Sequence, residues 1–260
     1  MPSPPPPALF DLRLAAMRRK RAERSPRLDT DFLMARAAED LADRLSVTNR
    51  RFALCLDIAT PTGHAAAALA ATGKTDKIVR VGPAQGVDED FALVSAGADL
   101  AVSLLALHQT NDLPGILAQI RRALKPGGLF LAAMIGGETL TQLRQSFLRA
   151  DSEISGGAPP RVAPFADVKT MGGLLQRAGF KLPVVDLDRV TARYDTLFGL
   201  LADLRAMGAT NALSERSRKP LRRAALRRAA EIYAETFADS DGRLCATFDI
   251  VWLSGWAPDG

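Results

Sequence analysis

Residues 53–69 read ALCLDIATPTGHAAAAL, and this stretch decides the fold. It is apolar as far as Leu56 and then reaches Asp57, which is typical of a buried strand that ends at a polar site. Its last part is rich in alanine and favours a helix. The loop ATPTG, residues 59–63, joins the two. A buried strand, an acid, a loop of small residues and a helix form the unit with which many proteins hold a nucleotide.

The loop itself departs from the usual nucleotide-binding composition, because Gly63 is its single glycine. Glycine in such loops permits positive φ and lets the backbone approach the ligand closely. Ala59 adds a methyl group, while Pro61 has no N–H to donate and pushes Thr60 toward extended geometry. The stretch therefore predicts the shape of a nucleotide site with weakened ligand-binding chemistry.

Strands and helices alternate on both sides of this stretch, which predicts an α/β fold built on a doubly wound parallel sheet. We expect strands at 52–58, 77–81, 98–107, 128–135 and 181–194, and a last strand in ATFDIVWLSGWAP (246–258). We expect helices at 9–24, 29–48, 63–72, 112–128, 137–154 and 168–180, and mostly helix over 195–237. The last two strands suggest an antiparallel hairpin at the edge of the sheet. The sheet is expected to bury Leu54, Leu56, Leu100, Val102, Leu104, Phe130 and Leu131.

Composition limits the classes of function. The 260 residues carry a net charge of +5, from 34 Lys and Arg against 29 Asp and Glu, and much of the excess lies in residues 13–24 and 216–228. These segments are either solvated helix faces or contacts for an acidic partner, nucleic acid or an anionic membrane. No aromatic residues lie among these arginines, so stacking on a single strand of nucleic acid is not expected.

The remaining composition predicts a cytoplasmic protein. Two cysteines and two histidines offer neither a disulfide framework nor a metal site. The proline-rich start MPSPPPPALF is not a secretory signal, and we expect its first eight residues to be disordered. No run of about 18 apolar residues occurs, so we expect no membrane-spanning segment, although contact with the periphery of an inner membrane is open.

Several longer stretches carry a family resemblance. LALHQTNDLPGILAQIRRALKPGGLFLAAM (105–134) resembles the end of the fourth strand, the helix and the fifth strand of class I S-adenosylmethionine-dependent methyltransferases. Three further stretches extend the match: LFDLRLAAMRRKRAER near the start, GGAPPRVAPFADVKTMGGLLQRAGFKLPVVDLDRVTARY, and AAEIYAETFADSDGRLCATFDIVWLSGWAP at the end. As a set they resemble the methyltransferase-like assembly factors of respiratory complex I, of the arginine-hydroxylase type, which are related to malonyl-carrier-protein methyltransferases.

The resemblance implies a Rossmann-like methyltransferase sheet with a reversed last strand, N-terminal helices and a helical lid insertion. It divides the chain into a tail (1–8), N-terminal helices (9–50), a Rossmann-like core (51–155) and the C-terminal part of the same domain (156–260), with the lid at 195–237. S-adenosylmethionine is the implied cofactor. The residues placed beside it by the resemblance are Asp57, Ala59, Gly63, Asp88 and Leu105.

The implied client is a protein, a subunit of respiratory complex I, and either methylation or arginine hydroxylation is open. The alternative is a non-catalytic pseudo-methyltransferase that binds its client. A nucleic-acid methyltransferase has little support, because the fourth strand runs into ALHQ and not into an Asn-Pro-Pro-aromatic sequence. The second strand favours the non-catalytic alternative, since it ends in Gly82 and Pro83 where the family has an acid for the ribose. Asp88 and Glu89 are the remaining candidates for that acid.

Three residues are candidates for catalysis. His108 follows the strand at 98–107 and is either a general base or a turn histidine that caps a neighbour. Glu138 either points into the site or complements a helix dipole from the first turn. Arg161 either bridges to an acidic group of a partner or is structural. In the lid, Gly208 is expected to end one helix and Asn211 to begin the next.

Overall fold

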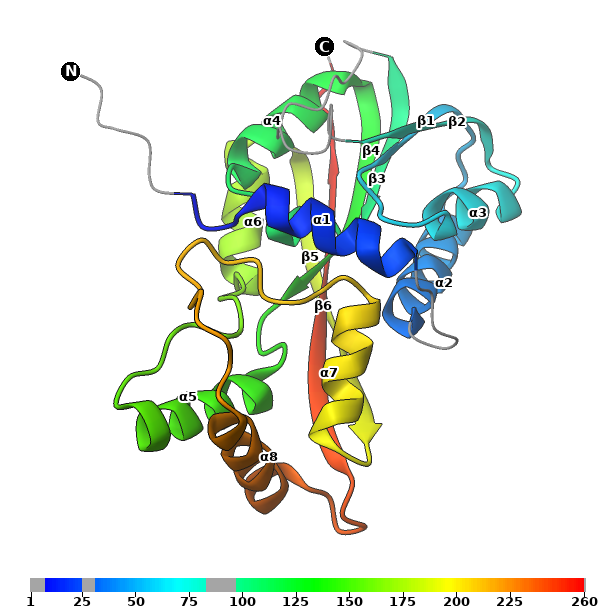
Figure 1. Cartoon of the computed structure of the whole chain (residues 1–260). Helices are drawn as coiled ribbons and strands as arrows, with labels where there is room; N and C mark the ends of the chain where they lie inside the picture. The colour runs from blue at the N-terminus through cyan, green and yellow to red at the C-terminus, as the bar shows by residue number, and fades with distance from the viewer. Residues whose placement is uncertain (1–7, 25–30, 83–96, 260) are drawn as a thin grey trace, which may run out of the picture. The chain divides into compact units, whose positions relative to one another are not determined.

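The computed structural model describes residues 8–24, 31–82 and 97–259, and it has an α/β architecture (Figure 1). The chain forms two compact units. Unit 1 combines residues 1–27, 139–164 and 191–247; unit 2 combines residues 28–138, 165–190 and 248–260. The chain passes from one unit to the other within its last two strands. Asp88, Glu89 and the first seven residues lie outside the described residues.

Unit 2 is organised by a six-stranded sheet with the order β2-β1-β3-β4-β6-β5. The strands β1 to β4 are parallel, and β6 runs antiparallel to β4. The bounds of the six strands are β1 Phe52–Ile58, β2 Thr75–Val81, β3 Ala98–Leu104, β4 Leu124–Gly136, β5 Lys181–Tyr194 and β6 Leu244–Trp256. The reversed last strand and the adjacent β5 and β6 at one side of the sheet confirm the expected methyltransferase topology.

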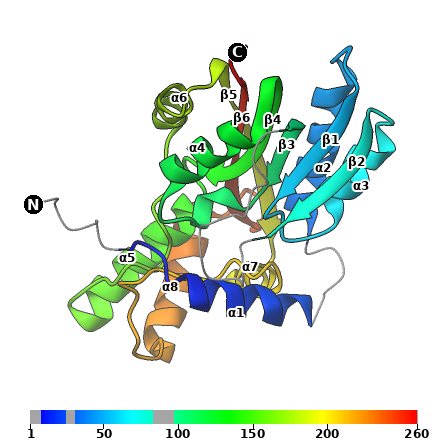
Figure 2. The same cartoon turned by 90° about the horizontal axis from the view of Figure 1, so that it is seen from above.

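Helices cover both faces of this sheet (Figure 2). α4 (Leu113–Ala123) and α6 (Val168–Arg177) pack on one face, and their apolar residues share a core cluster with the strands. α2 (Phe32–Ser46) and α3 (His64–Ala71) lie on the other face (Figure 2). A short 3-10 helix, η2 (Leu107–Gln109), follows β3. Because both faces are covered, β3 is buried along its whole length.

The predicted core is confirmed at six of its seven positions, since only Leu54 is half-buried. The predicted end of α4 was wrong, because the helix stops at Ala123 and not at residue 128. Leu124 already has extended backbone, and the turn at Gly127 (φ +66°) lies inside β4. Extended pairing with β3 begins at Leu124 and therefore ends the helix early.

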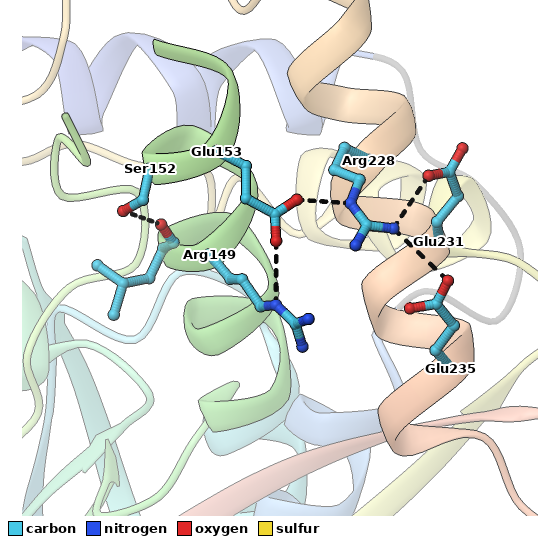
Figure 3. A network of polar contacts seen from close by, with 7 residues as sticks. Arg149, Ser152, Glu153, Arg228, Glu231 and Glu235 are labelled. Atoms are coloured by element: carbon cyan, nitrogen blue, oxygen red, sulfur yellow. Dashed lines mark hydrogen bonds and ion pairs between the residues drawn. The ribbon is translucent and has the colours of Figure 1, made fainter. Parts of the chain in front are cut away.

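Unit 1 contains four helices among its described residues: α1 (Leu12–Glu23), α5 (Thr141–Ser155), α7 (Leu197–Ala206) and α8 (Arg223–Phe237). α5 and α8 pack through buried side chains that include Leu143, Phe147, Ile232 and Tyr233. Arg228 of α8 forms an ion pair with Glu153 of α5, and it also pairs with Glu231 and Glu235 of its own helix (Figure 3). Exposed pairs of this kind contribute little, so the apolar contacts provide most of the stability.

The N-terminal segment is built into unit 1. Asp11 caps α1 by accepting a hydrogen bond from Leu14 N at 3.0 Å, and its own N–H donates to Ala212 O at 2.8 Å. Phe10 pairs with Leu213 in an isolated antiparallel bridge. The loop after α7 thus binds the backbone of Phe10 and Asp11.

The prediction that Asn211 begins a helix was wrong. Residues 209–222 are not helical, and the next helix starts at Arg223. The Asn211 side chain instead accepts from Leu213 N at 3.0 Å and donates to Pro160 O at 2.8 Å. Asparagine commonly replaces helical bonds with such local side-chain bonds.

Candidate functional site

The candidate site lies at the carboxyl ends of β1, β2, β3 and β4 in unit 2. Because these strands are parallel, their ends meet at one edge of the sheet, which is where open α/β folds bind ligands. Asp57 on β1 is opposite Arg80 on β2 and Val102 on β3. The sequence prediction named Asp57 but missed Arg80.

Asp57 and Arg80 form an ion pair at this edge. Arg80 Nε donates to Asp57 Oδ2 at 3.1 Å. The Asp57 side chain is fully buried, whereas that of Arg80 is half exposed. Burial raises the pKa of Asp57, and the Thr60 hydroxyl and the Arg80 guanidinium only partly oppose that shift. Asp57 Oδ1 is buried and has no hydrogen-bond partner among the described residues.

Arg80 also holds the loop that follows β1. Its NH2 group donates to Thr60 O at 2.9 Å and to Thr62 O at 2.7 Å. From the other side, Leu104 N at the end of β3 donates to the buried Thr60 hydroxyl at 3.1 Å. The loop is therefore fixed by its two neighbouring strands.

Ala59 has the backbone conformation that glycine usually provides in nucleotide-binding loops. Its φ is +57°, in the left-handed region that favours glycine, and its N–H donates to Val81 O at 2.7 Å. Gly63 precedes α3, and a side chain there would meet nothing within 4 Å. The shape of a ligand-binding loop is thus retained although only one of its glycines remains.

The other predicted residues at this edge lie beyond β3 and β4. Leu105 is half-buried with a φ of +49°, and its N–H donates to Ala133 O at 2.8 Å. His108 lies in η2, half-buried, with its ring 6.3 Å from that of Phe165. This position agrees with both readings of His108, as a base and as a turn residue.

Glu138 does not belong to the first turn of a helix, because α5 begins only at Thr141. Its side chain is exposed, and its N–H donates to Asp249 Oδ2 at 2.9 Å. Asp249 is buried on β6, opposite Gly136, and receives both Nε and NH2 of Arg189 at 2.7 and 2.9 Å. Sequence reasoning missed this acid; the signal was one carboxylate inside the apolar run TFDIVW.

The Asp249 carboxylate is stabilised in its charged form. Burial acts to raise the pKa of Asp249, but the hydrogen bonds from Arg189 and from Glu138 N outweigh it, and the pKa is lowered. The hydrogen bond to Asp249 and the charge of that carboxylate raise the pKa of the Arg189 guanidinium, and the charge of Glu138 adds to this effect. The cluster is therefore an ionised structural centre next to the exposed Glu138.

Arg161 belongs to unit 1, where it pairs with a carboxylate of its own chain. Its NH2 group donates to Asp151 Oδ1 at 2.8 Å, and its guanidinium lies over the Phe147 ring at 5.4 Å. Asp151 is buried, so this pair supports the structural interpretation of Arg161. In residues 8–24, 31–82 and 97–259, no group of His, Cys, Asp and Glu side chains is placed to hold a metal ion.

Comparisons with known proteins identify the family. Residues 31–184 match the methyltransferase domain. The chain is 37% identical to arginine-hydroxylase NDUFAF5 of Danio rerio over 248 residues, which are 88% of this chain and 76% of that one. The chain belongs to the methyltransferase-domain family that includes this protein.

The chain is also similar to two further curated proteins and to one solved structure. Identity is 35% to human arginine-hydroxylase NDUFAF5 over 265 residues, covering 95% of this chain and 76% of that one. Identity to malonyl-[acyl-carrier protein] O-methyltransferase of Nitrosospira multiformis is 35% over 216 residues, which are 79% of this chain and 68% of that one. The structure of the Bacillus subtilis YcgJ protein shares the fold, with a TM-score of 0.54 at 13% identity over 86% of this chain and 99% of that one.

The residues that the structure describes at the carboxyl ends of β1 and β2 are a poor fit for S-adenosylmethionine. Asp57, which the resemblance places beside the cofactor, already forms an ion pair with Arg80. Pro61 has no N–H to donate, and Gly82 at the end of β2 offers no carboxylate for a ribose. Among the described residues, the buried Asp57 Oδ1 and the left-handed backbone of Ala59 are the features of this edge that suit a ligand.

Proposed function

We propose that this chain is a methyltransferase-like protein that modifies or helps to assemble a subunit of respiratory complex I. The observation that carries the proposal is the extent of the likeness to arginine-hydroxylase NDUFAF5. With the rat protein the match covers 95% of this chain, at 36% identity over 266 residues, and so reaches well beyond the methyltransferase domain at 31–184. A fold shared only for cofactor binding would not preserve residues over both units.

We propose further that the client is a protein and that S-adenosylmethionine binds weakly. The ion pair between Asp57 and Arg80 supports weak binding, because a carboxylate already held by a guanidinium is a poor acceptor for a second cation. The same observation favours the second candidate function, a non-catalytic protein that holds its client without chemistry.

The exposed face of α1 is the surface that we propose for contact with an acidic partner or the periphery of an anionic membrane. At 100° per residue, Arg13, Met17, Lys20, Arg21 and Arg24 fall on one side of the helix, and all five are exposed. The opposite side packs within unit 1 through the buried Ala15. No helix among the described residues is long and apolar enough to span a bilayer.

Affinity purification tests the proposal. The tagged chain, cross-linked in cells that contain complex I, is expected to enrich one complex I subunit over a tagged methyltransferase of the same fold. Equal recovery of complex I subunits with both baits would overturn the proposed function. Mass measurement of the captured subunit then separates methylation, hydroxylation and binding without chemistry.

A further inference from the structure

A cation on β2, Arg80, binds the loop that follows β1. Arg80 reaches Asp57 Oδ2 with Nε and the carbonyl oxygens of Thr60 and Thr62 with NH2. Its side chain thus spans the loop from the acid at the strand end to the residue before Gly63. These groups lie at the carboxyl ends of β1 and β2, which is the edge at which open α/β folds bind ligands.

We propose that Arg80 excludes the amino-acid part of an S-adenosylmethionine-type ligand by occupying the ammonium position on Asp57; this rests on the family membership behind the proposed function. A ligand ammonium and the Arg80 guanidinium compete for the same buried carboxylate. If both bound Asp57, the ligand ammonium and the Arg80 guanidinium would lie close together and repel each other, because both are positive. Arg80 is therefore a specificity-determining residue of this chain.

The Arg80 side chain, and not the backbone of the loop, is the group that blocks the ligand. Ala59 already has the left-handed φ of +57° that a glycine would have. Leu104 N donates to the Thr60 hydroxyl at 3.1 Å, and because this bond does not involve Arg80, we expect it to hold Thr60 in an Arg80 variant. Asp57 Oδ1 is a buried acceptor without a hydrogen-bond partner among the described residues. Without Arg80, the Asp57 carboxylate would lack a counterion, and the loop at 59–63 would keep its conformation.

Isothermal titration of Arg80→Gln with S-adenosylhomocysteine tests this proposal. The wild-type protein is expected to bind more weakly than about 10 μM, and the variant at least about tenfold more tightly, which corresponds to about 1.4 kcal/mol. Adenosine, which lacks the ammonium and the carboxylate, is the second probe. Its affinity is expected to be the same for both proteins.

Arg51→Gln is the matched control, since it breaks the exposed pair between Arg51 and Asp76 at the start of the same two strands. It is expected to leave the affinity for S-adenosylhomocysteine unchanged. Should Arg80→Gln not fold, Arg80→Met keeps a side chain of similar length, and the same tightening is expected. The proposal is overturned if the Arg80 variant binds S-adenosylhomocysteine no better than wild type, or if adenosine gains as much.

These titrations are independent of the client. If they fail while the wild-type chain enriches a complex I subunit, the inference about Arg80 is wrong and the proposed function stands. If the subunit is not enriched, the proposed function fails whichever way the titrations turn out.

Discussion

Arg80 Nε lies 3.1 Å from Asp57 Oδ2, and the two residues are opposite each other on β2 and β1. The carboxylate is fully buried and the guanidinium is half exposed. The buried charge of Asp57 is therefore balanced by the guanidinium of Arg80, which reaches it from the surface. Removal of one partner from such a pair is costly, because the other charge stays desolvated.

Replacement of Arg80 by Gln is expected to lower the free energy of unfolding by about 1–3 kcal/mol at pH 8. Burial raises the pKa of Asp57 in the folded state and Arg80 opposes this, so loss of Arg80 raises the pKa further. A raised folded pKa stabilises the protein below the unfolded value, and this contribution is lost as the pH rises through the folded value. The deficit is therefore smaller at pH 4.5.

Urea unfolding at both pH values checks this prediction. Arg51→Gln is again the control, and it is expected to cost less than about 1 kcal/mol at either pH because its pair is exposed. An Arg80→Gln deficit that is the same at pH 8 and pH 4.5 would show that Asp57 is not the group affected.

Asp249→Ala is expected to cost about 2–4 kcal/mol at pH 7, because Arg189 and Glu138 N lose their common acceptor. Burial raises the pKa of Asp249, but the hydrogen bonds to its carboxylate lower the pKa by more. The stability that Asp249 provides is therefore present above about pH 3.9, the usual pKa of an unfolded aspartate. That stability is lost as the pH falls through the lowered folded value. Urea unfolding at pH 7 and pH 3 measures the difference. Asp186→Ala, which breaks an exposed pair with Arg44, is the control, and an equal cost for both variants contradicts the prediction.

Gly208→Ala is expected to destabilise unit 1 by about 1–3 kcal/mol. Gly208 has a φ of +70°, and a Cβ there would lie 3.0 Å from Arg19 Cα, so it would strain both the turn and the contact with α1. Gly157→Ala is the control, because nothing lies within 4 Å of its added Cβ. Thermal unfolding with equal midpoints for both variants would be the contrary result.

The exposed cations of α1 are expected to serve association and not stability. Serine at Arg13, Lys20, Arg21 and Arg24 is expected to change the free energy of unfolding by less than about 1 kcal/mol and to abolish co-sedimentation with the client or membrane fraction. Wild-type association is expected to weaken between 0.1 M and 1 M salt, as the Debye length falls from about 10 Å to about 3 Å.

Arg18→Ser is the comparison variant for the exposed cations, because Arg18 makes a contact inside unit 1 and donates to Asn211 O. This variant is expected to lose stability and to retain association. If the fourfold variant associates as wild type does, the exposed face of α1 is only a solvated surface.

The sheet and most helices could be predicted from the sequence, because apolar periodicity and turn residues are local signals. The contact between Arg80 and Asp57 could not, since Arg80 alternates with apolar neighbours in KIVRV and reads as a surface residue. Only the register of β1 and β2 brings the two together. Arg189 and Asp249 were missed for the same reason, as they are 60 residues apart and meet through the sheet.

Complex I abundance in cells that lack this chain tests the central claim most directly. The account predicts that native gels of the deletion strain show depleted or incomplete complex I, and that the wild-type gene restores it. Complex I of normal abundance and activity, with subunits of unchanged mass in the absence of the chain, would contradict the account.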